Sequence, residues 1–198
     1  MITSLLPALL FLLQSVLHIA MLLLVCRFLL QLAKANYYNP VTQLVIKATK
    51  PLLWPLQAVL PRMFTLDCSP LVLAWLIALA LIGLLHWSVL TVGMVDNAGL
   101  IFKLQQLSWL QVGLSALASV CMQVVSVYFW SVILVALSSW IQSLQRQPLV
   151  HVLHELISPL LNPVRRYLPA NTGIDFSPII VLLGLQTLMI LLKSLTLV

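Results

Sequence analysis

The sequence predicts an all-α membrane protein: four transmembrane helices arranged as two parallel repeats, each with a proline-broken amphipathic connector at the membrane interface. Three observations lead to this prediction. The 198-residue chain is 62% hydrophobic and only 7% charged, whereas soluble domains are about 25% charged. It contains several apolar runs long enough to cross a hydrocarbon core, which takes about 20 helical residues. The pattern of prolines in its first half also recurs in its second half.

The apolar runs that predict membrane helices cover about 5–33, 70–92, 112–140 and 178–198. Helices are expected because lipid offers no hydrogen-bond partner to backbone N–H and C=O groups. The first run has no basic segment before it and no small-x-small cleavage site. Its apolar core also exceeds the about 7 to 15 residues of a signal peptide. We therefore expect it to stay as a membrane helix.

Basic residues between the apolar runs predict the orientation of the chain. They gather in the segments that follow the first and third runs: Lys34, Lys47, Lys50 and Arg62, then Arg146, Arg165 and Arg166. Because cytoplasmic loops are enriched in Lys and Arg, both connectors are expected in the cytoplasm and both termini in the periplasm. The chain is thus expected to be a multi-pass protein of the cell inner membrane, although Lys193 argues mildly against this orientation.

The two connectors, residues 40–61 and 148–169, show helical amphipathicity. Apolar residues recur at helical spacing on one side of each, and polar and basic residues take the other side. Such helices lie in the interface and bind anionic headgroups through their cationic side chains. The candidate contacts to anionic lipid or to partner proteins are Arg165, Arg166, Lys47, Lys50 and Arg62. Two prolines in each connector are expected to break it into two pieces.

An internal repeat appears when the chain is shifted by 108 residues. Without a gap, the shift superposes Pro51 on Pro159, Pro55 on Pro163, Pro61 on Pro169, Asp67 on Asp175, Ser69 on Ser177 and Pro70 on Pro178. The first repeat is assigned to residues 1–97 and the second to residues 98–198. Because each repeat holds an even number of spans, both enter the membrane in the same direction and are parallel repeats.

These motifs resemble the two copies of the YGGT domain in the bacterial YggT (YlmG) family. The resemblance rests on NPVTQLVIKATKPLLWPLQAVLP with a following D-x-S-P, and on SPLLNPVRRYLPANTGIDFSP. It covers nearly the whole chain. The first copy departs from the family pattern, since it has no basic pair at the place of Arg165 and Arg166. A role for paired arginines is therefore expected in the second copy alone.

The resemblance implies an integral membrane protein with no established reaction. Family members are linked to osmotic-stress tolerance and ion homeostasis, and to cell division and nucleoid distribution. Plastid relatives are linked to thylakoid biogenesis and cytochrome maturation. We therefore expect a non-enzymatic membrane-organising or assembly factor, with membrane proteins as partners and no nucleic acid. A homo-oligomer is compatible with this expectation.

The alternative is a small channel or ion carrier that takes part directly in cation transport, such as that of potassium. It would need polar side chains that converge inside the membrane. The apolar runs offer few of them: Gln14, His18, Arg27, Gln123 and Gln186. Arg27 is the candidate intramembrane polar site, because a cation is expensive to bury in lipid. A guanidinium this near the end of the run can also snorkel to the interface.

The remaining motifs favour structural roles. Ser69 and Ser177, each before a proline that opens an apolar run, fit the N-cap position with proline at N1. The H-x-x-H-E run from His151 to Glu155 differs from the H-E-x-x-H pattern of zinc hydrolases and has no evident third ligand. No catalytic residue, cofactor or metal site is therefore expected.

Overall fold

The computed structural model describes residues 2–57, 67–92, 108–167 and 176–195. In these ranges all regular structure is helical, which confirms the all-α prediction. The helices are α1 (Ile2–Leu32), α2 (Pro40–Gln57), α3 (Ser69–Val92), α5 (Trp109–Ser138), α6 (Gln142–Gln145), α7 (Pro148–Tyr167) and α8 (Ser177–Leu195). Arg62, Pro61, Pro169 and Asp175 lie outside the described residues.

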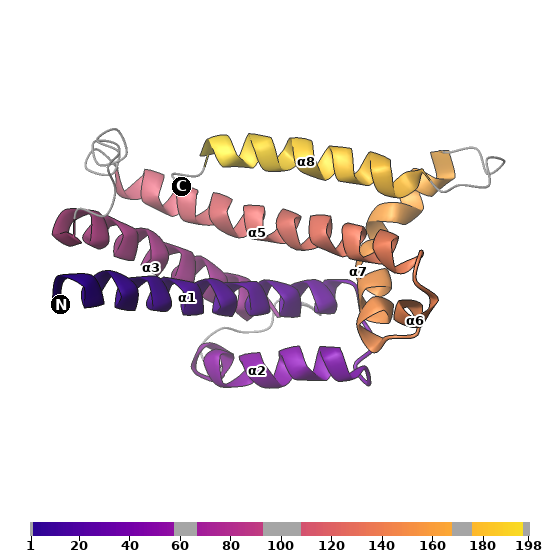
Figure 1. The fold of residues 1–198 in the computed structure, drawn as a ribbon, viewed down its shortest axis with the longest axis horizontal. Coiled ribbons are helices and arrows are strands. Elements are labelled where there is room, and N and C mark those ends of the chain that lie inside the picture. Colours follow the sequence, from indigo (N-terminus) through magenta and orange to yellow (C-terminus); the bar gives the residue numbers. More distant parts are fainter. Residues whose placement is uncertain (1, 58–66, 93–107, 168–175, 196–198) are drawn as a thin grey trace.

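Four of these helices are long and apolar enough to cross a membrane. The qualifying stretches are Leu6–Leu32 of α1, Ser69–Trp87 of α3, Trp109–Ser138 of α5 and Ser177–Ser194 of α8. Each agrees with an apolar run of the sequence to within a few residues. In Figure 1, α1 and α5 run from left to right, while α3 and α8 run back. This arrangement is the one expected for two parallel repeats.

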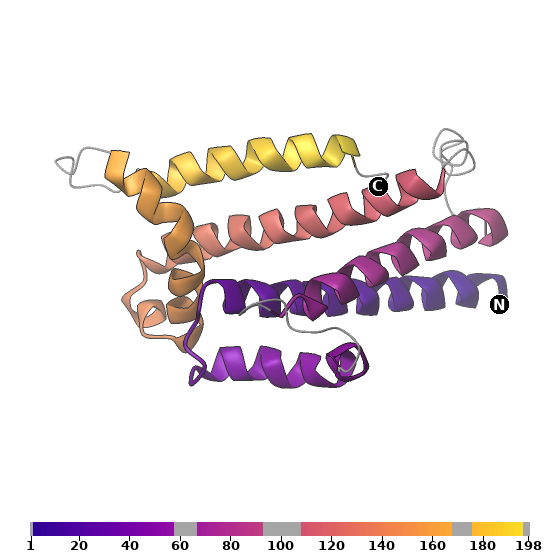
Figure 2. The same cartoon turned by 180° about the vertical axis from the view of Figure 1, so that it is seen from behind.

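The spans pack as two neighbouring pairs, α1 with α3 and α5 with α8, and the contact of α3 with α5 joins the pairs (Figures 1 and 2). Small residues lie at the centre of the packing. Ala74 and Ala78 of α3 and Ala116 of α5 are buried in one cluster with Leu24 and Val25 of α1. Small side chains allow helix backbones to approach closely, which favours association by van der Waals contact in lipid.

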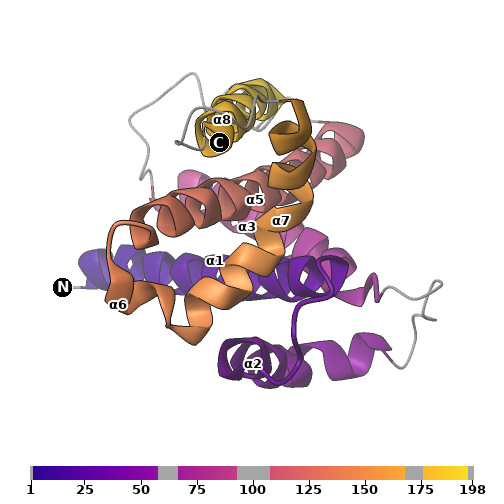
Figure 3. The same ribbon diagram turned by 90° about the vertical axis from the view of Figure 1, so that its right-hand side faces the viewer.

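Each connector docks its apolar face onto its own pair of spans. α2 packs on α1 and α3, and α7 packs on α5 and α8. α7 lies at the end of the molecule where α1 and α5 finish (Figures 1 and 3). Positions related by the 108-residue shift are buried in both connectors: Leu53 matches Leu161, and Thr49 matches Ile157. The two repeats therefore use the same helical face for docking.

The prolines do not divide either connector into separate helices, contrary to the expectation. α2 is continuous through Pro51 and Pro55, and α7 through Pro159 and Pro163. A proline inside a helix removes one N–H donor and crowds the carbonyl four residues earlier, which bends the helix without ending it where packing holds both sides. Figure 3 shows such curvature along α7.

The turn from α1 into α2 is built by local hydrogen bonds. Lys34 takes a left-handed conformation, with φ of 51°. Its N–H donates to the carbonyl of Gln31, and the next N–H, of Ala35, donates to that of Leu30. This is a Schellman motif. Asn39 then caps α2, because its side-chain oxygen accepts the N–H of Val41 and proline follows at the first helical position.

The same turn joins the two repeats. The N–H of Asn36 donates to the Glu155 carboxylate of α7 at 2.9 Å, and the Asn39 side-chain amide donates to the carbonyl of Pro148 at 2.8 Å. Pro148 is the repeat partner of Pro40, the residue after Asn39. The two connectors therefore meet at equivalent ends.

The two serines expected as N-caps lie one position further into their helices. The carbonyls of Cys68 and Phe176 accept the first helical N–H groups, so α3 and α8 begin at Ser69 and Ser177. Both serines are buried. The hydroxyl of Ser69 donates to Asp67 rather than accepting a backbone N–H. Sequence patterns locate helix ends only to within one or two residues.

The docking of α2 gives the first testable prediction. Leu53 is fully buried in the cluster that joins α2 to α1 and α3. We expect Leu53→Ala to destabilise the protein by about 2–5 kcal/mol, because a buried Leu→Ala change removes contacts and leaves a cavity. Denaturant unfolding in detergent micelles measures this loss. Leu44→Ala on the exposed face of α2 is the matched control, and an equal loss in both variants would contradict the docking of α2 by this face.

Candidate functional site

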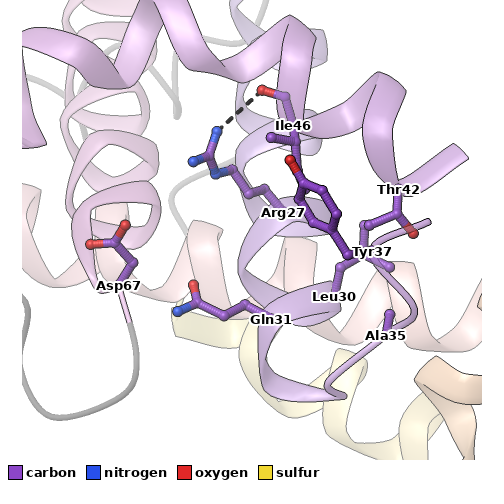
Figure 4. Close-up of a pocket in the computed structure, with 8 residues that line it drawn as sticks. All are labelled: Arg27, Leu30, Gln31, Ala35, Tyr37, Thr42, Ile46 and Asp67. Atoms are coloured by element: carbon purple, nitrogen blue, oxygen red, sulfur yellow. Dashed lines mark hydrogen bonds between the residues drawn. The ribbon is translucent and has the colours of Figure 1, made fainter. Parts of the chain in front are cut away.

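An open pocket of about 330 Å³ lies where the end of α1 meets α2 and the segment before α3 (Figure 4). It combines polar and apolar side chains from these elements. They are Arg27, Leu30, Gln31, Ala35, Tyr37, Thr42, Ile46 and Asp67. The pocket therefore brings the candidate intramembrane cation together with one aspartate of the repeat signature.

Arg27 joins the first span to the connector. Its Nη1 donates to the Thr49 hydroxyl at 2.9 Å and to the backbone carbonyl of Ile46 at 3.3 Å. Thr49 is fully buried, and its hydroxyl donates its own hydrogen to the carbonyl of Val45 at 2.7 Å. The hydroxyl can therefore serve Arg27 as an acceptor while its hydrogen is used within α2. The sequence left two interpretations of Arg27: snorkelling to the interface, or pairing within the protein. These hydrogen bonds favour pairing within the protein.

Asp67 lies on another side of the same pocket. Its carboxylate accepts hydrogen bonds from the Gln57 amide at 3.1 Å and from the Ser69 hydroxyl at 3.4 Å. It therefore connects the end of α2 to the start of α3. Among the described residues, no direct ion pair joins Asp67 to Arg27, and Figure 4 shows their charged groups apart. A cation and an anion thus face one open space without neutralising each other by contact.

Thr42 is a third polar residue of the pocket lining, and its hydroxyl makes no hydrogen bond to the described residues. Thr42 is only 3% exposed, and its buried hydroxyl has no hydrogen-bond partner in the described part of the chain. Burying a hydroxyl without a partner costs about 1–3 kcal/mol. A hydroxyl buried in this way lowers the stability of the fold.

The second repeat has apolar residues in place of Arg27, Thr49 and Thr42. Under the 108-residue shift, Arg27, Thr49 and Thr42 correspond to Val135, Ile157 and Val150. These three are buried, and Val135 and Ile157 belong to one apolar cluster between α5 and α7. The same helix contact thus forms without polar residues. The fold does not require Arg27 and Thr49 at this position.

The predicted cationic contacts lie outside the pocket, on the two connectors. Lys47 and Lys50 are exposed on α2, and Arg165 and Arg166 are exposed near the end of α7. The structure therefore does not bring the four side chains into one cluster. It presents them on two separate helical surfaces.

The histidines of α7 share their surface with Arg165. Burial lowers the pKa of His154 below its usual value, and the charges of Arg165 and His151 lower it further. Glu155, the carboxylate of the H-x-x-H-E run, accepts the N–H of Asn36. The structure thus gives Glu155 a role in joining the repeats.

Polar side chains of two spans also meet in a second cavity. A cavity of about 180 Å³ is lined by Gln14 and His18 of α1 and Ser119 of α5, together with apolar residues. The Ser119 hydroxyl donates to the carbonyl of Ser115 at 2.8 Å. Gln186 of α8 is exposed and does not line this cavity.

Comparisons with known proteins agree with the fold and with the repeat. A family model described as CCB3/YggT matches residues 6–88 and again residues 114–196. The chain is 34% identical to an Escherichia coli K12 protein described as "Uncharacterized protein YggT", over 90% of this chain and 85% of that protein. A Vibrio alginolyticus protein is 30% identical, over 89% of this chain and 88% of its own length. A Haemophilus influenzae protein is 31% identical, over 85% and 82%. No solved structure matches the chain.

The charge environment of His154 yields a pH prediction. Because its pKa is lowered in the folded protein, the unfolded chain binds a proton more readily, and stability should fall as the pH drops below about 6.5. We expect a histidine titration followed by NMR to place the pKa of His154 below its usual value. Arg165→Gln should raise that pKa, while Arg166→Gln serves as the matched control. A titration at or above the usual value would contradict this environment.

Proposed function

The chain belongs to the CCB3/YggT family, and from this premise we propose that it is a non-enzymatic membrane-organising or assembly factor of the cell inner membrane. Its connectors bind anionic lipid headgroups and hold partner membrane proteins at the cytoplasmic face. The observation that supports this proposal is the outward face of α2. There, basic side chains alternate with large apolar ones although the opposite face is docked on the spans.

The outward face of α2 has the composition of a helix that lies in a membrane interface. Leu44 is 64% exposed and Trp54 is 77% exposed, and Lys47 and Lys50 lie beside them along the helix. Tryptophan is enriched where apolar lipid meets water. Lysines at that depth attract anionic headgroups with about 1 kcal/mol each. The face therefore favours an anionic lipid surface.

Comparison of the connectors explains why α2 has this role. The repeat partners of Leu44 and Ala48 in α7 are Val152 and Leu156, which are buried against α1 and α2. α7 thus uses this part of its surface to hold the two repeats together. The same part of α2 is exposed and is available for lipid. α7 adds the exposed Arg165 and Arg166 at its far end.

The links of the family to osmotic-stress tolerance, ion homeostasis and cell division fit a role at the level of the membrane. Direct cation transport, such as that of potassium, is the alternative. The cavity of Gln14, His18 and Ser119 favours it, because these side chains offer oxygen and nitrogen atoms inside the spans. The outward face of α2 favours the organising role more strongly, because a carrier has no need of exposed tryptophan and lysines on a connector.

Removal of the connector charges tests the proposal. We expect the quadruple variant Lys47→Gln, Lys50→Gln, Arg165→Gln and Arg166→Gln to lose preference for phosphatidylglycerol over phosphatidylcholine. The loss should be about fivefold per charge that contacts lipid, from about 1 kcal/mol for each. Native mass spectrometry of the purified protein with mixed lipids measures which lipid species remain bound to it. The difference should shrink at high ionic strength, since salt screens exposed charges.

The control for this experiment removes a charge away from the connectors. Lys193→Gln, near the C-terminal end of α8, should leave the lipid preference unchanged. An unaltered preference in the quadruple variant would remove the support for lipid binding by the connectors.

The proposed orientation predicts how the cysteines react. Cys68 is exposed just before α3, whereas Cys26 and Cys121 lie within the apolar stretches of α1 and α5. A membrane-impermeant maleimide should label Cys68 in inside-out vesicles and fail to label it in intact spheroplasts. Cys68→Ser should abolish the labelling. Labelling of Cys68 in intact spheroplasts would reverse the assigned topology.

A further inference from the structure

We propose that the pocket between Arg27 and Asp67 binds a phosphoethanolamine group, as carried by a zwitterionic phospholipid with a primary amine. Arg27 would hold the phosphate and Asp67 the ammonium group. The inference concerns side chains that the proposed lipid contacts of the connectors do not use. It can therefore stand or fail independently of that function.

The depth of the pocket fits a lipid headgroup. The apolar stretch of α1 that ends at Leu32 has 27 residues, which is about 40 Å at 1.5 Å per residue. Because this exceeds the about 30 Å of the hydrocarbon core, the ends of the stretch extend into the headgroup region and place Arg27 near the boundary. The volume of about 330 Å³ lies within the range of about 300–1,000 Å³ that small-ligand sites have.

Arg27 retains donors for a phosphate. Both of its described hydrogen bonds use Nη1, whereas a guanidinium has five N–H donors. The N–H groups of Nε and Nη2 remain, and they have the spacing that binds two phosphate oxygens at once. The bonds of Nη1 to α2 fix the guanidinium, so little side-chain freedom is lost when a ligand binds.

Asp67 favours a zwitterionic ligand over a simple anion. An anionic group on Arg27 would lie near a carboxylate that no direct ion pair neutralises. A ligand with an ammonium group beside its phosphate supplies the missing positive charge. The Asp67 oxygens accept hydrogen bonds from Gln57 and Ser69, and a carboxylate has about four acceptor positions. A primary ammonium can donate to the remaining ones, and a quaternary amine cannot.

The second repeat shows that these polar residues are not needed for packing. Val135 and Ile157 form the corresponding contact within an apolar cluster. A partly buried guanidinium carries a desolvation cost that this apolar pair avoids. A ligand bound to Arg27 accounts for the presence of the polar pair in one repeat alone.

The repeat itself supplies the variant for the test. The double variant Arg27→Val and Thr49→Ile gives the first repeat the valine–isoleucine contact of the second repeat. It should fold, because Val135 and Ile157 already pack in this way between α5 and α7. Asp67→Asn keeps the shape of the side chain and removes its charge. Native mass spectrometry of the full chain with phosphatidylethanolamine, phosphatidylcholine or phosphatidylglycerol measures binding. Lys193→Gln, near the C-terminal end of α8, is the control outside the pocket and outside both connectors.

We expect the wild-type protein to prefer phosphatidylethanolamine over the other two lipids. The double variant should lose at least about tenfold of that affinity, as charge-assisted hydrogen bonds are lost. Asp67→Asn should shift the preference toward phosphatidylglycerol, and Lys193→Gln should retain the wild-type preference for phosphatidylethanolamine. Competition by soluble phosphoethanolamine would show that the headgroup alone is recognised, and its failure to compete would show that the lipid is the ligand.

Two results would overturn the proposal. One is equal binding of phosphatidylethanolamine by the wild-type protein and the double variant. The other is an unchanged lipid preference in Asp67→Asn, which stays informative if the double variant does not fold. Loss of phosphatidylglycerol binding in the connector variant alone would leave this pocket unaffected.

Discussion

The docking of each connector onto its own pair of spans is the constraint on which the rest of the structure depends. Leu53 in α2 and Leu161 in α7 occupy equivalent buried positions, so the same helical face packs against the spans in both repeats. The packing of this face determines which connector residues point outward and which reach α1. It aligns Thr49 with Arg27, and it leaves the lysines and the tryptophan of α2 on the outside. Both candidate sites follow from one packing choice.

Much of the fold could be predicted from the sequence, because the membrane imposes strong rules. Apolar length located the four spans, and helical periodicity located both connectors to within a few residues of α2 and α7. The start of α3, the continuity of α2 through Pro51 and the short α6 were not predicted. These features depend on local hydrogen bonds and on tertiary packing, to which residue patterns are only loosely related.

The pocket could not be predicted from the sequence, although part of its signal was present. Arg27 stood out as a cation in an apolar run, but periodicity cannot show which connector residue lies against it. The repeat holds the clue, since Arg27 and Thr49 are both polar where Val135 and Ile157 are both apolar. Two positions that change polarity together indicate contact. Asp67 gave no such signal, because its repeat partner is also an aspartate.

The Arg27–Thr49 contact restricts the order in which the two repeats could diverge from a common unit. Thr49 donates its hydroxyl hydrogen within its own helix, so a threonine beside a valine is tolerated. An arginine beside an isoleucine would lose the shorter of its two hydrogen bonds and keep only the one to the Ile46 carbonyl, so a partly buried charge would be poorly paired. Of the two mixed pairs, valine with threonine therefore costs less than arginine with isoleucine. A change from one pair to the other is thus least costly when the threonine is present before the arginine is introduced, and when the arginine is removed before the threonine.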